Sequence, residues 1–319
     1  MSYVAASVVP PGFRADLSRW RQLVSADWLA ALLGPGGVAG AAPAGQWQLF
    51  EVGCEGRAQF LAGHIAGAHY VDTQEFERPP FWNKLPEAAL CNLLQHLGLG
   101  PASSVILYGR NTLAAARVAH LLLCAGVDDV RLLDGGLAAW CAAGHALQPG
   151  PGRRRQATPD VTTNAGARAS SLALAARPGY VLNLAQARAL LARTDAALVS
   201  IRSRTEWMGE TSGYSYIAQR GEIAGARWGH AGQDGDVNSM SSMQDAAGRM
   251  KPAALIQAMW AEAGIHPGMQ IAFYCGTGWR ASLAFFYAWL MGWERISVFD
   301  GGWYEWSADP ANPVVCRSP

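Results

Sequence analysis

The chain repeats itself at a constant offset, and this duplication limits the folds that it can adopt. Residues 105–109 (Val-Ile-Leu-Tyr-Gly) match residues 271–275 (Ile-Ala-Phe-Tyr-Cys), and two Asp-Gly-Gly segments begin at residues 134 and 300. Both pairs lie 166 residues apart, so the segment between them aligns without a gap. A third match joins residues 63–68 to residues 221–226. A repeat of this length in 319 residues predicts two copies of one folding unit, each of ordinary domain size.

Each copy contains the same predicted elements in the same order. A capped helix is followed by a buried strand, a glycine turn, an amphipathic helix, a strand–loop–helix and a last short strand. In the two copies the first helices are 26–33 (after Ser25) and 184–192 (after Asn183), the first strands 48–52 and 197–201, the amphipathic helices 88–97 and 252–262, and the last strands 130–133 and 296–299. Short apolar strands that alternate with helices predict an α/β fold, with a mainly parallel sheet covered on both faces and ligands at the carboxyl ends of its strands.

The composition between the copies indicates a linker. Residues 149–178 are rich in Pro, Gly, Arg, Ala and Ser and have little periodicity, and three arginines run from Arg153 to Arg155. These arginines suit either a solvated linker or contact with an acidic partner. We therefore divide the chain into an N-terminal domain (1–150), a linker (151–178) and a C-terminal domain (179–319).

One stretch of the C-terminal domain carries the features of a reactive site. An apolar strand (271–274) ends on Cys275, passes two glycines, and leads into a helix predicted from Ala281 to Met291. Such a turn directs successive N–H groups into one concavity. These groups, the helix N-terminus and Arg280 would stabilise a negative sulfur, which predicts a nucleophilic cysteine. The alternative is a buried structural cysteine.

The spacing between Cys275 and Arg280 narrows the chemistry. Four residues separate them, whereas cysteine phosphatases need five to surround a tetrahedral phosphate. The shorter loop suits a smaller target, such as a sulfur atom carried on the cysteine. A phosphatase or arsenate reductase is the remote alternative.

Cys-x-x-Gly-x-Arg resembles the active-site loop of the rhodanese family of sulfurtransferases, and the resemblance extends over nearly the whole chain. Residues 60–68 are close to the family's first signature, with Ala66 where proline is usual, and residues 299–306 fit its C-terminal signature. In tandem-domain members the second domain is typically catalytic. Here Gly109 stands in the first domain where Cys275 stands in the second, and Ala114 stands where Arg280 does. The resemblance therefore implies a non-catalytic first domain that forms one wall of the cleft.

The resemblance also implies a mechanism that needs no metal or organic cofactor. Cys275 would take a sulfane sulfur from thiosulfate or a related donor as a persulfide, and a thiol or cyanide would remove it. The alternatives are a 3-mercaptopyruvate donor, because the loop begins Cys-Gly-Thr-Gly, and a persulfide relay between proteins. The donor-binding candidates are Gly276, Thr277, Gly278, Trp279 and Arg280 of the loop, together with Arg202 and Arg204.

Two features near these arginines depart from the family pattern. Ser200 replaces the aspartate of the family's Asp-x-Arg segment, and Glu206 stands where the family carries a substrate-gripping arginine. Residues 211–219 form an insert that the first copy lacks. With Trp207, Trp228, His230 and Trp279 this insert predicts an aromatic rim over Cys275, unless these rings only pack in the interior.

Composition excludes several other classes of protein. A net charge of +1 gives no electrostatic reason to expect nucleic acid or an anionic membrane as a partner. No apolar run reaches membrane-spanning length, the start of the chain lacks a signal-peptide pattern, and the six cysteines show no zinc-site spacing. We therefore expect reduced cysteines, a cytoplasmic location, small-molecule donors and acceptors, and at most a protein sulfur acceptor as macromolecular partner.

Overall fold

The computed structural model describes residues 9–34, 41–45, 47–153 and 176–317, and its two halves contain the same parallel five-stranded sheet. The first sheet has the order β1 (Leu23–Val24), β7 (Asp129–Leu133), β6 (Ser104–Gly109), β2 (Trp47–Gly53), β3 (His69–Asp72). The second has the order β8 (Val181–Leu182), β13 (Ile296–Phe299), β12 (Gln270–Tyr274), β9 (Ala196–Ser200), β11 (Arg227–Trp228). The same order in both sheets confirms the duplicated α/β fold.

Helices cover both faces of each sheet, because strand residues alternate between two apolar clusters. In β6, Val105 and Leu107 belong to the cluster that holds α4, whereas Ile106 and Tyr108 belong to the cluster formed with α1, α2 and α5. The helices of the first half are α1 (Ala26–Leu33), α2 (Arg57–Ala62), α3 (Glu87–His96), α4 (Thr112–Ala125) and α5 (Gly136–Ala142). Those of the second are α7 (Leu184–Leu191), α8 (Arg204–Met208), α9 (Ala253–Glu262), α10 (Trp279–Leu290) and α11 (Gly302–Ala308).

Short elements complete the described chain. Four short strands form two antiparallel ladders: β4 (Glu77–Arg78) pairs with β5 (Asn83–Lys84), and β10 (Glu222–Ile223) pairs with β14 (Val314–Val315). The predicted helix starts are confirmed, since the side chains of Ser25 and Asn183 accept hydrogen bonds from the backbone of the first turns of α1 and α7.

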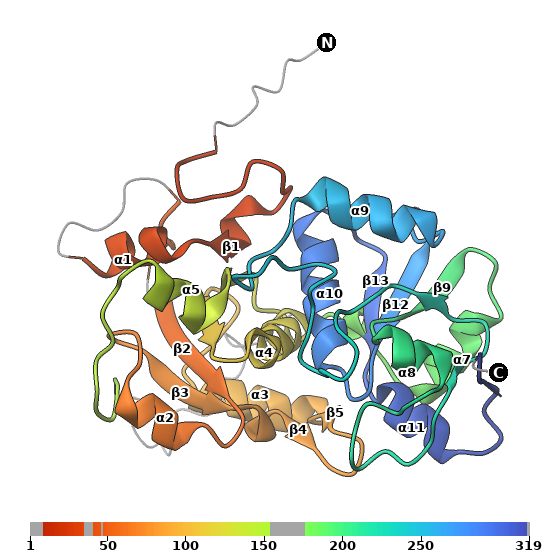
Figure 1. The fold of residues 1–319 in the computed structure, drawn as a ribbon. Coiled ribbons are helices and arrows are strands. Elements are labelled where there is room, and N and C mark those ends of the chain that lie inside the picture. The colour runs from red at the N-terminus through yellow and green to blue at the C-terminus, as the bar shows by residue number, and fades with distance from the viewer. Residues whose placement is uncertain (1–8, 35–40, 46, 154–175, 318–319) are drawn as a thin grey trace.

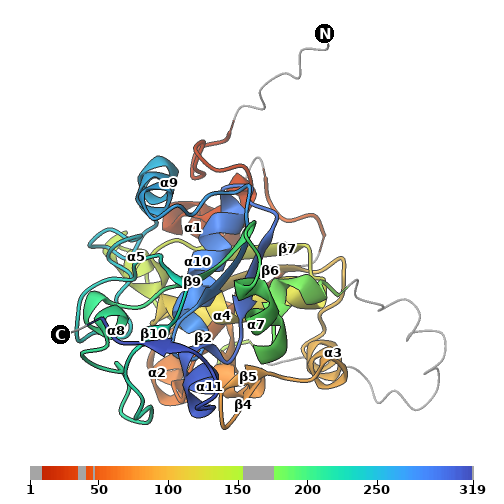
Figure 2. The same cartoon turned by 90° about the vertical axis from the view of Figure 1, so that its right-hand side faces the viewer.

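The two halves lie side by side and share one core, with α4 and α10 in contact between them (Figures 1 and 2). Residues 113–125 of α4 and 280–290 of α10 are buried on all sides. A helix that is buried all round needs apolar neighbours in every direction, and here each helix supplies part of the other's cover. One apolar cluster therefore runs through both halves.

A reciprocal pair of contacts repeats the internal symmetry at the interface. Asp300 accepts a hydrogen bond from the backbone N–H of Lys84 at 2.7 Å, and Asp134 accepts one from the backbone N–H of Met250 at 2.8 Å. Residues 84 and 250 are 166 apart, as are 134 and 300. Each Asp-Gly-Gly segment thus binds the equivalent strand or loop of the other half.

The structure corrects one predicted boundary near the reactive stretch. Helix α10 begins at Trp279 and ends at Leu290, so the prediction of a start at Ala281 was wrong by two residues. Gly278, with φ +101°, turns the backbone directly into the helix. Trp279 and Arg280 consequently stand in the first helical turn.

Some sequence predictions fall on parts that the structure does not describe. Residues 154–175, which include most of the proposed linker and two of its three arginines, lie outside the described residues.

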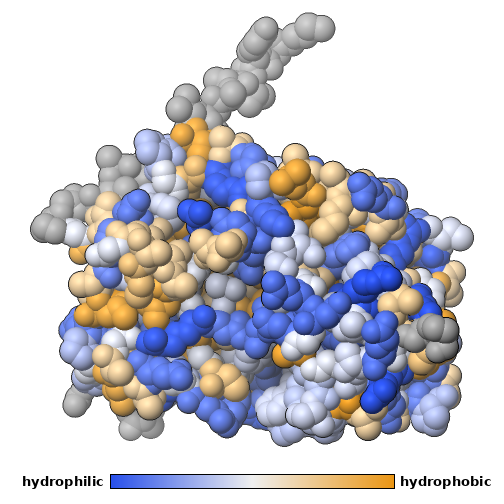
Figure 3. Space-filling model, in the orientation of Figure 1, coloured by the Kyte–Doolittle hydropathy of each residue, from blue (hydrophilic) through white to orange (hydrophobic). Residues whose placement is uncertain are grey.

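Among the described helices, none combines the length and apolar character needed to cross a membrane. On the face in Figure 3, hydrophilic and hydrophobic residues are intermixed.

Candidate active site

Cys275 lies at the carboxyl end of β12, at the start of the turn that leads into α10. Its Sγ accepts a hydrogen bond from the backbone N–H of Gly278 at 3.2 Å. Its carbonyl accepts the N–H of Trp303 at 2.8 Å, which ties the turn to α11. Only 1% of Cys275 is exposed. The thiol is therefore held at the floor of the turn, and a reagent must come close to the loop to reach it.

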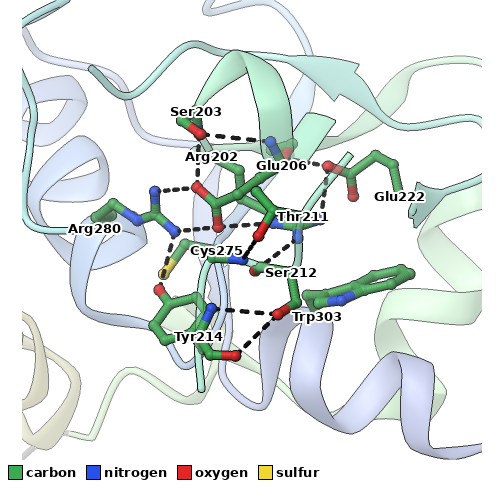
Figure 4. Close-up of polar contacts among 12 residues, drawn as sticks. Arg202, Ser203, Glu206, Thr211, Ser212, Tyr214, Glu222, Cys275, Arg280 and Trp303 are labelled. Carbon is green, nitrogen blue, oxygen red and sulfur yellow. Dashed lines mark hydrogen bonds and ion pairs between the residues drawn. The ribbon is translucent and has the colours of Figure 1, made fainter. Parts of the chain in front are cut away.

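Tyr214, from the insert of residues 211–219, lies over this turn. A side chain added at Gly276 would overlap the Tyr214 ring, so the ring packs directly on the loop backbone at that glycine. Figure 4 shows Tyr214 beside the sulfur of Cys275. Burial raises the pKa of the Tyr214 hydroxyl, so this side chain stays neutral.

Arg280 is committed to a carboxylate. Its Nη1 donates to Oε2 of Glu206 at 2.7 Å and its Nη2 donates to Oε1 of Glu206 at 2.9 Å, a bidentate pair (Figure 4). Nη2 also donates to the hydroxyl of Tyr214 at 2.9 Å. Both residues of the pair are almost fully buried. The charge of Arg280 is therefore balanced inside the protein.

Glu206 holds a second arginine. Nε of Arg202 donates to Glu206 at 3.3 Å, Nη1 donates to the carbonyl of Gly221 at 2.7 Å and contacts Glu222 at 3.3 Å, and Nη2 donates to the carbonyl of Ser212 at 3.2 Å. All three nitrogens of this buried side chain have partners. Arg204, in contrast, is exposed at the first residue of α8.

The electrostatics of Glu206 follow from these contacts. Burial by itself would raise the pKa of its carboxyl, but the neighbouring charges of Arg280 and Arg202 outweigh burial and lower the pKa to about 2. Glu206 is thus ionised at neutral pH and forms an internal ion network with the two arginines.

A cavity of about 300 Å³ adjoins the loop, and both halves of the chain line it. The loop contributes Thr277, Trp279 and Arg280, the insert contributes Tyr214 and Tyr216, and the N-terminal half contributes most of the rest. The complete lining is Cys54, Thr73, Gln74, Glu77, Trp82, Leu113, Tyr214, Tyr216, Val237, Asn238, Thr277, Trp279 and Arg280. The N-terminal half therefore forms one wall of this cavity, and the family resemblance implied such a wall for the cleft.

The aromatic rim has fewer members than the sequence predicted. Trp279 and the tyrosines of the insert line the cavity, whereas Trp207, Trp228 and His230 do not. Trp228 stacks on Trp207, with ring centroids 6.2 Å apart, and its other neighbour is the tilted ring of His230 at 3.7 Å. Those three rings pack against one another outside the cavity.

Sequence reasoning missed a polar cluster that crosses the domain interface. Arg117, on α4 and fully buried, binds Glu77 of β4 at 2.6 Å and Asp300 of the second Asp-Gly-Gly segment at 2.6 Å. The other carboxylate oxygen of Glu77 accepts the indole N–H of Trp279 at 3.0 Å. An arginine within a mostly apolar predicted helix was the available signal, but it does not identify its partners.

Comparison with known proteins identifies the same family in both halves of the chain. A family model described as a rhodanese-like domain matches residues 25–143 and again residues 183–309. The thiosulfate sulfurtransferase YnjE of Escherichia coli is 46% identical over 315 residues, which cover 99% of this chain and 70% of that protein. A probable 3-mercaptopyruvate sulfurtransferase of Pseudomonas aeruginosa is 31% identical over 82% of this chain and 87% of its own length.

Solved structures resemble the whole described fold. The crystal structure of YnjE superposes with a TM-score of 0.87 at 47% identity and covers 95% of this chain and 70% of that one. An anaerobic ergothioneine biosynthesis enzyme from Chlorobium limicola, in complex with trimethyl histidine, gives a TM-score of 0.85 at 34% identity, with 95% and 72% coverage. A variant of EanB that carries a cysteine persulfide together with ergothioneine gives 0.86 at 33% identity, again with 95% and 72% coverage.

Proposed function

The chain belongs to the rhodanese family and is a sulfurtransferase, and from this premise we propose that it transfers a sulfane sulfur from thiosulfate to a thiophilic acceptor through a persulfide on Cys275. One observation carries the proposal. Cys275 lies at the carboxyl end of β12, with its Sγ against the N–H of Gly278 at the start of a buried helix. A sulfur anion at this place gains a hydrogen bond and the favourable end of the helix dipole.

The reaction consists of two displacements at sulfur. The Cys275 thiolate attacks the outer sulfur of thiosulfate, the S–S bond of the donor breaks, and sulfite leaves with the electron pair. The acceptor, a thiolate or cyanide, then attacks the outer sulfur of the Cys275 persulfide. That S–S bond breaks, the Cys275 thiolate returns, and the product is the acceptor's persulfide or thiocyanate.

Residue spacing in the EanB structures supports Cys275 as the carrier. Among these structures are variants at one tyrosine and at one threonine, besides the form with a persulfide on cysteine. The tyrosine precedes the persulfide cysteine by 59 residues, which is the separation of Tyr216 from Cys275. The threonine follows that cysteine by two residues, as Thr277 follows Cys275. Tyr216 and Thr277 both line the cavity here.

We assign distinct roles to the other predicted site residues. The loop residues Gly276, Thr277 and Gly278 surround the transferred sulfur with backbone groups, and Trp279 forms a wall of the cavity. Arg280 and Arg202 hold the loop and the insert in place through Glu206, because their terminal nitrogens already have partners. Arg204, which is exposed, is the candidate for first attraction of an anionic donor.

A 3-mercaptopyruvate donor is the second candidate, favoured by the Cys-Gly-Thr-Gly start of the loop and by the Pseudomonas aeruginosa relative. A protein acceptor fits less well, because Cys275 is 1% exposed beneath Tyr214 and offers little surface for a second protein. Phosphate-ester hydrolysis fits less well still, since the loop is short and Arg280 is bound to Glu206.

The role of the first domain can be inferred from the residues that it has in place of the reactive ones. We propose that the N-terminal domain (1–150) is non-catalytic, since it has Gly109 and Ala114 in place of the cysteine and arginine. Residues 151–178 join it to the catalytic domain (179–319).

All six cysteines are free. Free cysteines on the surface, such as Cys54 and Cys141, suit a reducing compartment such as the cytoplasm.

Intact mass spectrometry tests the proposal. The protein is incubated briefly with thiosulfate, and separately with 3-mercaptopyruvate, beside the variants Cys275→Ser and Cys54→Ser. We expect wild type and Cys54→Ser to gain one sulfur atom and Cys275→Ser to gain none. Cys54 is the matched control because it is a free cysteine that lines the cavity next to the loop. Equal sulfur gain by Cys275→Ser, or no gain by wild type from either donor, contradicts the proposal.

A further inference from the structure

The cavity beside the catalytic loop is lined by the carboxylate of Glu77, and the other copy of the repeat has no carboxylate at the equivalent position. In the first half, Glu77 pairs with Lys84 in the β4–β5 ladder. In the second half, Gln244 forms the equivalent bridge with Met250, which is the counterpart of Lys84. Gln244 is neutral and bonds the hydroxyls of Tyr287 and Thr112. A neutral glutamine is therefore sufficient at the interface site that has no nucleophile. The charged residue of this pair, Glu77, occurs at the site that contains Cys275.

The charge of Glu77 is only partly balanced. Arg117 binds both Glu77 and Asp300, each at 2.6 Å, so two carboxylates share one guanidinium. On the other side of the interface, Asp134 forms no ion pair with an arginine among the described residues and accepts a hydrogen bond from the N–H of Met250. Burial raises the pKa of Glu77, and the charge of Arg117 opposes this rise. With the carboxylates ionised, the cluster of Glu77, Arg117 and Asp300 carries one net negative charge next to the cavity.

The remaining lining supplies no free positive charge. Among the described residues that line the cavity, the one cation is Arg280. Its charge and that of Arg202 are balanced by Glu206 and Glu222. The other walls include four aromatic rings, those of Trp82, Tyr214, Tyr216 and Trp279. The Tyr214 ring already faces the guanidinium of Arg280, at 5.6 Å from its centroid. Trp82, Tyr216 and Trp279 remain for a bound molecule.

Aromatic faces with a nearby carboxylate attract organic cations and repel anions. A quaternary ammonium is the chemical group that such walls recognise best, since its charge interacts with ring faces and its low hydration makes transfer from water cheap. An anionic group in the same place would meet Glu77 with no unpaired cation to compensate.

We propose that this cavity selects a sulfur acceptor that carries an organic cation, such as a trimethylammonium group, and that Glu77 of the N-terminal domain determines this specificity. The proposal rests on the proposed function, because the acceptor's nucleophile must remove sulfur from the Cys275 persulfide. In that step the acceptor sulfur–sulfur bond forms, the persulfide S–S bond breaks, and the electron pair returns to Cys275. The cationic group remains chemically unchanged in the cavity.

The test uses three thiols of similar size and different charge in a single turnover. The protein is first loaded with thiosulfate and freed of donor, and its persulfide is confirmed by mass. Transfer is then measured to thiocholine (cationic), 3,3-dimethylbutane-1-thiol (its neutral isostere) and 3-mercaptopropionate (anionic), with rates expressed per concentration of thiolate. We expect thiocholine to exceed its neutral isostere by about tenfold in second-order rate, and the anionic thiol to be the slowest.

Two variants separate a charge effect from a structural one. Glu77→Gln introduces the residue that the chain itself uses at the equivalent position of the second half. It should slow thiocholine and accelerate 3-mercaptopropionate, and the thiosulfate loading step should also become faster. Loss of packing alone would slow all of them together. Glu294→Gln is the control for removing one negative charge, because Glu294 is exposed and is not among the residues that line this cavity.

A further pair of variants tests the aromatic wall. Tyr216→Leu should reduce the preference for thiocholine several-fold, whereas Tyr216→Phe should retain it. Equal rates for the three thiols in wild type, or the same preference in Glu77→Gln, would overturn the proposal. If no persulfide forms, the proposed function fails instead. The cavity is then tested by titrating tetramethylammonium chloride against wild type and Glu77→Gln by calorimetry, with sodium chloride as the reference and no binding as the contrary result.

Discussion

Glu206 binds both terminal nitrogens of Arg280, at 2.7 and 2.9 Å, in a buried ion pair at the first turn of the helix that follows the Cys275 loop. The sequence places this glutamate where the rhodanese family carries a substrate-gripping arginine. Relative to the family pattern, a negative charge therefore replaces a positive one at residue 206. The positive charge of Arg280 is then bound by Glu206 inside the protein. A site built in this way holds its loop firmly but offers an anionic donor little attraction.

The first prediction concerns the pH dependence of this pair. Because the folded protein lowers the pKa of Glu206 to about 2, from an ordinary value of 4.5, its contribution to stability is complete above about pH 4.5 and is lost as the pH falls toward 2. This contribution is about 3 kcal/mol. Glu206→Gln should be less stable than wild type by about that amount at pH 7, and the two should converge near pH 2. Urea unfolding at pH 7, 4 and 2.5 measures the difference.

A control removes a carboxylate that is not paired in this way. Glu294→Gln, on the exposed surface, should follow wild type at each pH. A difference between Glu206→Gln and wild type that stays constant from pH 7 to 2.5 would mean that packing, and not ionisation, accounts for the loss.

The second prediction concerns access to the nucleophile. Tyr214 packs against the loop and its hydroxyl is bonded to Arg280, while Cys275 is 1% exposed. Tyr214→Ala should open the approach, and iodoacetamide should then alkylate Cys275 about tenfold faster, because alkylation requires an accessible sulfur. Peptide mapping gives the rate at Cys275, with the exposed Cys141 in the same digest as an internal control. An unchanged rate would show that Tyr214 does not limit access.

The third prediction concerns Gly276. Its backbone carries no side chain at the point where the Tyr214 ring rests, and a methyl group there would overlap the ring. Gly276→Ala should displace Tyr214 or the loop, lower stability by about 1–3 kcal/mol and slow sulfur transfer. Gly179→Ala is the matched control, since a methyl group at Gly179 meets no atom within 4 Å. Equal behaviour of the two variants in thermal unfolding and in transfer would contradict the close packing at Gly276.

Local patterns in the sequence were sufficient for the fold and for the position of Cys275 at the end of a strand. The two strand–loop–helix copies share an offset of 166 residues, so their sheets had to share one order, and Cys275 had to follow a strand. The start of α10 was missed because Gly278 adopts a positive φ that allows the helix to begin at once, and residue type alone does not reveal this conformation.

The partners of the charged residues could not be predicted in the same way. Glu77 and Asp300 meet Arg117 across the domain interface and far apart in the chain, so no spacing rule joins them. Arg202 and Arg280 were predicted to bind substrate because arginines near a reactive cysteine usually meet anions. Which acid neutralises them depends on how the short helix α8 and the insert fold back over the loop.

The last prediction concerns Arg117, which distinguishes the two sides of the interface. Without its guanidinium, Glu77 and Asp300 would remain buried with no cation, and breaking a buried pair in this way costs about 3–5 kcal/mol. Asp134 shows the direction of this effect, since burial raises its pKa to about 6 although the N–H of Met250 and the charges of Arg14 and Arg249 oppose the rise. A carboxyl whose pKa is raised in the folded state loses stability as the pH rises through that value. Arg117→Met should therefore be destabilised more at pH 8 than at pH 5.

Urea unfolding of Arg117→Met at these two pH values tests this expectation. Arg193→Met, which removes an arginine from an exposed pair with Asp195, should unfold like wild type at both. Because Glu77 also binds the indole of Trp279, loss of Arg117 should release that wall of the cavity and slow transfer from the Cys275 persulfide, even where the variant is fully folded. A variant with wild-type transfer rates at pH 5 would mean that the interface cluster stabilises the two domains without positioning the loop.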